Sequence, residues 1–230
     1  MRHVFVALAF LGLLQPSVAS AQSGPVVVEL YTSQGCSSCP PADALLHELA
    51  KRDDVIALAL HVDYWDYIGW KDDFASPEYT ARQHAYAHAA NATTVYTPQM
   101  VIGGVEHVVG SRPMQVMDVV QKRRSAGNPV AVSLTRDGDD VQISAEPGGD
   151  GNYVVQLVRY VPEESVSIRR GENAGQNLSY ANIVQSWDII SQWDGVAPLD
   201  LTAQAPGDNP VAVIIQQASN GPIVGAAQLR

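Results

Sequence analysis

Two apolar runs near the start of the chain have the pattern of buried strands. They span Val26–Thr32 and Val55–Val62, and neither alternates with polar residues as a half-buried strand would. Between them, two prolines precede a stripe of three leucines. Because proline is tolerated in the first turn of a helix, this pattern predicts a helix over residues 38–51.

The next segments predict a second helix, a hairpin and a third helix. A serine, a proline and an acid at Ser76–Glu78 are typical of a helix start, and that helix would run to about Ala90. Strands at Pro98–Ile102 and Val105–Val109 flank a two-glycine turn. A further helix opens at Ser111–Pro113. The order β-α-β-α-β-β-α predicts an α/β domain with a parallel sheet, covered by helices and extended by a hairpin.

The pattern changes after residue 127. Short alternating runs, turn signals and apolar strands such as Tyr153–Tyr160 and Val211–Gln217 follow one another to the end of the chain. This is typical of a β-rich, sandwich-like domain. We therefore expect two domains, over residues 22–127 and 128–230.

Residues 1–21 resemble a cleavable export signal. A short positive start precedes an apolar run from Val4 to Leu14, and Ala19-Ser20-Ala21 is an A-x-A cleavage pattern. The run is too short to span a bilayer as a helix. An uncleaved anchor or a buried N-terminal helix is the alternative. Export implies an oxidising compartment, so we expect a secreted protein or, in a Gram-negative bacterium, a periplasmic one.

Composition narrows the classes of partner. The formal net charge is −10, which argues against nucleic acid or an anionic membrane surface. No segment after the leader reaches the length of a membrane span. The chain has 2 cysteines, too few for a disulfide-rich scaffold or a four-cysteine zinc site.

Cys36 and Cys39 carry the clearest chemistry. A cysteine at a helix start faces unpaired N–H groups and the positive end of the helix dipole, which lower its pKa and favour the thiolate. Thiolate is the nucleophile of disulfide exchange, so Cys36 would attack and Cys39 would resolve the mixed disulfide. Such a pair needs no organic cofactor. The alternative is a stabilising disulfide, although closing a loop this short removes little entropy from the unfolded chain and so adds little stability.

The element order, the position of the CxxC and Thr97-Pro98 before the third strand together resemble the thioredoxin fold. That resemblance implies a cis proline at Pro98 and a substrate-binding role for Thr97 and Pro98. A proline that simply opens a strand is the alternative. Gly35 stands where well-studied thioredoxins have tryptophan, and two serines separate the cysteines. The direction of electron transfer is therefore open.

The resemblance can be narrowed to an uncharacterised family of secreted bacterial proteins with a thioredoxin-like domain and a C-terminal β domain. It rests on four motifs: ELYTSQGCSSCPPAD at 29–43, HVDYWD at 61–66, TPQ at 97–99 and RGENAG at 170–175. This family brings a fold but no established reaction.

Several other residues have two interpretations. Two thiolates also bind Cu(I), and the side chains that could supplement them are His61, His84, His88, His107 and Met100. We favour a solvated helix face for His84 and His88, strand positions for His61 and His107, and core packing for Met100. No metal site is therefore expected except Cu(I) on the two cysteines.

Three segments could border the disulfide. The aromatic side chains of Tyr64, Trp65, Tyr67 and Trp70 could line a groove or cap a core. Asp63 and Asp66 could relay protons to Cys39 or lie on the surface. The Arg169–Gly175 loop could approach the disulfide or merely form a turn.

The leading hypothesis is an exported thiol–disulfide oxidoreductase acting on protein or small-molecule thiols and disulfides, together with an unknown redox partner. The alternatives are a Cu(I) chaperone or carrier that uses the reduced thiols, and a non-catalytic binding module with a structural disulfide.

Overall fold

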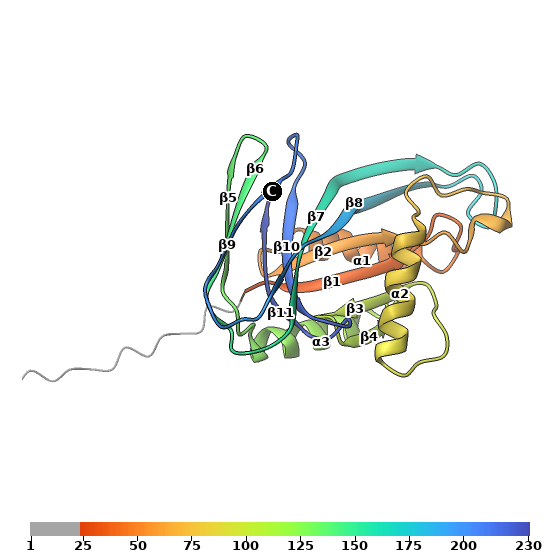
Figure 1. Ribbon diagram of the computed structural model, residues 1–230. Coiled ribbons are helices and arrows are strands. Elements are labelled where there is room, and N and C mark those ends of the chain that lie inside the picture. The colour runs from red at the N-terminus through yellow and green to blue at the C-terminus, as the bar shows by residue number, and fades with distance from the viewer. Residues whose placement is uncertain (1–23) are drawn as a thin grey trace, which may run out of the picture.

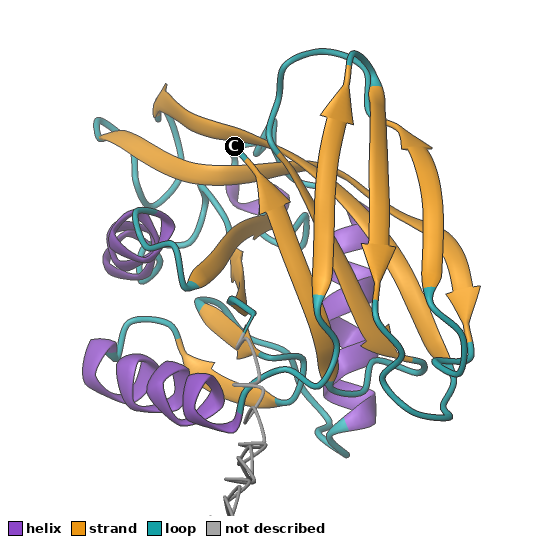
Figure 2. Ribbon diagram, turned by 90° about the vertical axis from the view of Figure 1, so that its left-hand side faces the viewer, coloured by secondary structure: helices purple, strands orange, loops and turns teal. Residues whose placement is uncertain are grey.

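The computed structural model describes residues 24–230, so the expected leader lies outside the described residues. The described chain is a mixed α/β fold with a large sheet (Figures 1 and 2). Its elements are β1 (Val26–Thr32), α1 (Pro40–Ala50), β2 (Val55–His61), the 3₁₀ turn η1 (Asp66–Ile68), α2 (Pro77–Ala89), β3 (Gln99–Ile102), β4 (Glu106–Val109), α3 (Pro113–Ala126), β5 (Val132–Asp137), β6 (Asp140–Ala145), β7 (Tyr153–Ser167), β8 (Asn177–Trp193), β9 (Leu199–Gln204), β10 (Val211–Gln217) and β11 (Ile223–Leu229).

The element order expected for the first half is confirmed, with η1 as an addition. The strands lie in the order β2-β1-β3-β4. Only β1 and β2 are parallel, because the hairpin β3–β4 joins β1 in the antiparallel direction. The parallel sheet expected here is thus limited to one strand pair.

Four strands of the second half extend the same sheet. Its full order is β11-β10-β7-β8-β2-β1-β3-β4, and β8 joins β2 in parallel at Ala59 and Ile183. The strands β5, β6 and β9 form a separate small sheet. This sheet packs against β7 and β10 through a core that includes Ile143, Val155 and Val213. Strands from both sides of residue 127 therefore share one sheet.

Helices cover both faces of the first-half strands. Alternate residues of β1 point to opposite faces, as the period of a strand requires. Leu30 packs with α1 and α3, whereas Tyr31 packs with α2. This arrangement fixes the start of α1 against the carboxyl ends of β1 and β2.

The long ribbon of β7 and β8 reaches the same end of the sheet (Figure 1). The loop at its tip, residues 168–176, comes from the second half of the chain but lies beside the segment that follows β2. In residues 24–230, no helix combines the length and apolar character that a membrane crossing requires.

Candidate functional site: a covered disulfide at the start of a helix

Cys36 and Cys39 form a disulfide, with their Cα atoms 5.4 Å apart. Cys39 is the N-cap residue of α1, and its carbonyl oxygen accepts hydrogen bonds from the N–H groups of Ala42 and Asp43. Pro40 occupies the first helical position, where no N–H is needed. The pair therefore sits at the strand-to-helix junction that the sequence predicts.

Thr97 and Pro98 lie next to this junction. The peptide bond between them is cis, as the resemblance implies. A Cβ at Gly110 would lie 3.0 Å from the Cβ of Ala42 and 3.3 Å from that of Pro98, so Pro98 borders the first turn of α1. The role of Thr97 and Pro98 in binding a substrate stays a prediction.

Two tryptophans of the segment after β2 cover the turn that holds the cysteines. Trp65 donates from Nε1 to Thr97 Oγ1 at 2.8 Å, and Trp70 donates to Gln34 Oε1 at 2.7 Å. A Cβ at Gly35 would lie 3.2 Å from Trp65 Cβ. Tyr67, by contrast, is 82% exposed. Trp65 and Trp70 thus close the site from one side.

The tip of the β7–β8 ribbon covers the turn as well. Asn173 donates from Nδ2 to the carbonyl oxygens of Gln34, at 2.9 Å, and Cys36, at 3.1 Å. Ser37 donates from Oγ to Glu172 Oε2 at 2.5 Å. Of the two interpretations of the Arg169–Gly175 loop, the approach to the disulfide is therefore the one observed.

A buried polar cluster lies at the ends of β1 and β2. Thr32 donates from Oγ1 to Asp43 Oδ1 at 2.8 Å, and His61 Nδ1 lies 2.7 Å from Asp72 Oδ2. Thr32 and His61 are register partners on the two parallel strands. Asp43 Oδ2 and His61 Nε2 have no hydrogen-bond partner within residues 24–230. Buried polar atoms without partners are rare, so these two atoms distinguish this cluster from the rest of the core.

Burial and charge set the protonation of the two aspartates. Burial raises the pKa of Asp43 to about 7, although His61 and the Thr32 hydroxyl oppose the shift. Burial also acts to raise the pKa of Asp72, but His61 and the backbone N–H of Gln34 outweigh it, and the pKa is lowered. Asp43 therefore stays largely protonated until the pH approaches about 7, whereas Asp72 is ionised at that pH.

Asp43 and Asp72 were missed by the sequence interpretation, which considered Asp63 and Asp66. Asp63 Oδ1 accepts from Thr80 Oγ1 at 2.6 Å, and Asp66 Oδ1 accepts from the Asp72 N–H at 3.1 Å. Asp63 and Asp66 therefore stabilise the local structure of the segment after β2. A signal for Asp43 is present in the sequence, because it lies four residues after Cys39 on the apolar face of the helix.

The candidate copper ligands beyond the cysteines are dispersed. His84 and His88 are exposed on α2, as expected for a solvated face, and Met100 is buried in the core, also as expected. His107 lies 3.3 Å from Gln99 Nε2. Within residues 24–230, no group of three or more His, Cys, Asp or Glu side chains is placed to hold a metal ion.

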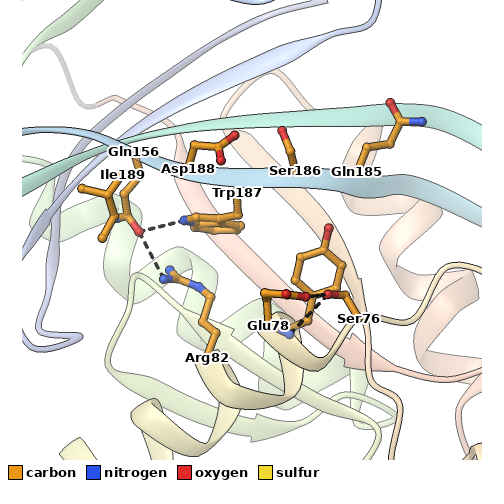
Figure 3. Close-up of a pocket in the computed structure, with 10 residues that line it drawn as sticks. Ser76, Glu78, Arg82, Gln156, Gln185, Ser186, Trp187, Asp188 and Ile189 are labelled. Carbon is orange, nitrogen blue, oxygen red and sulfur yellow. Dashed lines mark hydrogen bonds between the residues drawn. The ribbon is translucent and has the colours of Figure 1, made fainter.

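A cavity of about 360 Å³ lies between α2 and β8 (Figure 3). Its charged lining residues are Glu78, Arg82 and Asp188, and Arg82 stacks on the Trp187 ring at 3.8 Å and donates to Gln156. Arg82 is also paired with the buried Glu29 at 2.8 Å. The positive charge of this cavity is therefore already paired within the protein.

The fold and the site define a class: a mixed α/β protein with a covered CxxC disulfide at the start of its first helix. Within that class, the chain belongs to the family described as "Protein of unknown function (DUF1223)", which matches residues 27–216. A comparison with curated proteins returned no match.

Two solved structures are similar to the chain. The crystal structure of protein AGR_C_4864 from Agrobacterium tumefaciens is 36% identical, with a TM-score of 0.79, over 91% of this chain and 96% of that one. HBP35 of Porphyromonas gingivalis is 17% identical, with a TM-score of 0.62, over 90% of this chain and 75% of that one. The second likeness concerns the fold alone.

Proposed function

We propose that the protein is an exported thiol–disulfide oxidoreductase with Cys36 and Cys39 as its redox centre. The observation that carries the proposal is the disulfide at the N-terminus of α1. Helix N–H groups and the helix dipole stabilise a thiolate there. The β2-β1-β3-β4 strand order and the cis bond before Pro98 support a thioredoxin-like first half.

The exchange needs only the two cysteines and a substrate thiol. A substrate thiolate attacks Cys36 Sγ, the Cys36–Cys39 bond breaks, and Cys39 leaves as a thiolate that takes up a proton. A second substrate thiolate attacks the substrate sulfur of the mixed disulfide and releases Cys36 as a thiolate that takes up a proton, so two substrate thiols are oxidised to a disulfide and the protein is reduced. The reverse sequence reduces a substrate disulfide.

Asp43 can serve this exchange as a proton-holding group. It lies one helical turn beyond Cys39, is fully buried and keeps a carboxyl oxygen without a partner. Because its pKa is about 7, both its neutral and ionised forms are accessible near neutral pH. The ionised form disfavours a thiolate at Cys39 by repulsion between like charges, and the neutral form removes that repulsion.

The test is capture of the intermediate. A Cys39→Ser variant is incubated with a reporter peptide whose cysteines form a disulfide. The variant should accumulate a mixed disulfide at Cys36, which mass spectrometry detects. A Cys36→Ser variant is the matched control and should trap far less, because its remaining thiol lies inside the first turn of α1. Absence of exchange by the native protein and absence of trapping by Cys39→Ser would together refute the proposal.

A second candidate is a binding module in which the disulfide is structural. It is favoured by the burial of both cysteines, each 0% exposed. A midpoint potential below about −300 mV would support this candidate, since structural disulfides resist reduction by the glutathione pool. Tight Cu(I) binding by the reduced protein, lost in Cys36→Ser, would instead support a copper carrier.

The export part of the proposal rests on residues 1–21 alone. Expression of the full chain in a Gram-negative host tests it. The mature protein recovered from the periplasm should begin at Gln22, as N-terminal sequencing would establish. A cytoplasmic protein with an intact N-terminus would contradict export.

A further inference from the structure

The covering of the disulfide is local and specific. Cys36 and Cys39 are completely buried, yet Ser37 and Ser38 between them are exposed. The CxxC turn therefore lies at the surface although its cysteines are inaccessible, and Cys36 Sγ contacts Ser38 Oγ at 3.4 Å. Besides Trp70, the residues from other segments that hydrogen-bond to this turn belong to the loop at the tip of the β7–β8 ribbon, residues 168–176, which we call the cap.

Asn173 is the main attachment of the cap. Its side-chain amide donates to the carbonyl oxygens of Gln34 and Cys36. A carboxamide has two N–H donors, so both are used on the CxxC turn. The residue is only 1% exposed. The exposed contact from Ser37 to Glu172 is a second attachment.

The cap is held together by its own backbone hydrogen bonds, and the strand segment that precedes it is exposed. The Ile168 N–H donates to Gln176 O at 2.9 Å, and the Gly175 N–H donates to Ile168 O at 2.8 Å. The adjoining part of β7, residues 162–165, is exposed on both faces. The ribbon becomes anchored again near Tyr180, which is buried against His61. Ile168, at the base of the cap, is its one buried apolar side chain, so the part of the cap beyond Ile168 can separate from the CxxC turn with little effect on the core.

The chemistry of exchange requires such a separation. An incoming thiolate must approach Cys36 Sγ along the axis of the Cys36–Cys39 bond, because the leaving sulfur departs on the opposite side. With both sulfurs buried, that approach is closed. Displacement of Asn173 would also leave Gln34 O without a protein donor, whereas Cys36 O keeps the Cys39 N–H as a donor. The vacant place on Gln34 O must be filled by another N–H group or by water.

We propose that the cap, residues 168–176, is a displaceable cover that shields the Cys36–Cys39 disulfide until an extended polypeptide donates its own backbone N–H groups to the oxygens released by Asn173. The inference rests on the proposed function, because it assigns the substrate to polypeptides rather than to small thiols. Glutathione has only two amide N–H groups, one of them in a γ-linkage that departs from the spacing of an extended backbone, and would be a poorer substrate than a longer chain.

The experiment measures how fast a water-soluble phosphine reduces the oxidised protein. Phosphine attack breaks the S–S bond, and hydrolysis yields two thiols and the phosphine oxide, so the assay needs no enzymatic activity. Asn173→Ala should be reduced at least ten times faster than the native protein. Asn173→Asp, which keeps the size of the side chain but lacks both donors, should behave in the same way.

Asn177→Ala is the matched control. Asn177 lies on the same ribbon, and its side chain contacts Ser167 rather than the CxxC turn. It should be reduced at the native rate. Each rate is measured across low urea concentrations, since reduction through local opening depends weakly on urea and reduction through global unfolding depends steeply on it.

The outcomes separate the cap from the function. Equal rates for the native protein and both Asn173 variants would overturn the cap, and so would acceleration that follows global unfolding. Acceleration, combined with no exchange by the native protein and no mixed disulfide in Cys39→Ser, would support the cap and refute the oxidoreductase. Exchange with glutathione as fast as with a cysteine-containing peptide would overturn the assignment of the substrate.

Discussion

At the scale of single residues, Asp43 is the most informative side chain outside the disulfide. Its pKa of about 7 lies above the ordinary value of 3.8 because the carboxyl is fully buried. A group whose pKa is raised on folding favours the folded state most at low pH, and this contribution is lost as the pH rises through the folded pKa. The relevant window runs from pH 3.8 to about 7.

Asp43→Asn should therefore gain stability relative to the native protein as the pH rises. Asparagine keeps the acceptor for the Thr32 hydroxyl and cannot ionise. The difference in unfolding free energy should move by roughly 3 kcal/mol in favour of the variant between pH 5 and pH 8. Urea unfolding of both oxidised proteins measures it. Asp53→Asn, at an exposed site, is the control, and a parallel pH dependence of Asp43→Asn and native protein would contradict the prediction.

At the scale of elements, one buried ion pair ties α2 to the sheet. Arg82 of α2 forms two hydrogen bonds to the carboxylate of Glu29 on β1, and Tyr86 also donates to that carboxylate. The Arg82 side chain is 12% exposed and Glu29 is completely buried. Loss of one partner leaves the other charge in the core, which is far more costly than loss of both.

Arg82→Met should accordingly lower the free energy of unfolding by about 3–5 kcal/mol. The double variant Glu29→Gln with Arg82→Met should lose clearly less, because the buried charge is removed as well. Denaturant unfolding at pH 7 compares the three proteins. Equal losses in the single and double variants would show that packing of Arg82 on Trp187, and not the charge of Glu29, accounts for the effect.

The elements also show where sequence patterns suffice. Apolar runs and proline positions predict β1, α1, β2 and the hairpin because local preference and burial agree there. The same patterns do not reveal that Glu29, within an apolar run, pairs with Arg82, and they leave open whether the Arg169–Gly175 loop contacts Cys36 or forms only a turn. Both contacts join residues more than 50 positions apart, and a polar residue in isolation carries no sign of its distant partner.

At the scale of the whole molecule, the two halves share one of the three hydrophobic clusters formed by residues 24–230. Ile56 and Leu58 of β2 pack in one cluster with Val158 of β7 and Ile214 of β10. The change of composition at residue 127 is real, but it separates stretches of sequence whose strands lie in a single sheet. The shared sheet also brings the cap to the disulfide, because Asn173 of the second half donates a hydrogen bond to Cys36 of the first half.

This shared core predicts that the oxidised protein unfolds in one cooperative transition. The fragment of residues 22–127 would expose the edge of β2 and the apolar residues that β7 and β10 cover, so it should not form a stable tertiary structure. Calorimetry of the full chain should give equal calorimetric and van't Hoff enthalpies, and the fragment should lack a near-ultraviolet circular dichroism signal. Two separate thermal transitions, or a fragment with native-like aromatic signals, would mean that the cluster around Leu30, which the first half forms alone, is sufficient for folding and that the sheet joins two independent folding units.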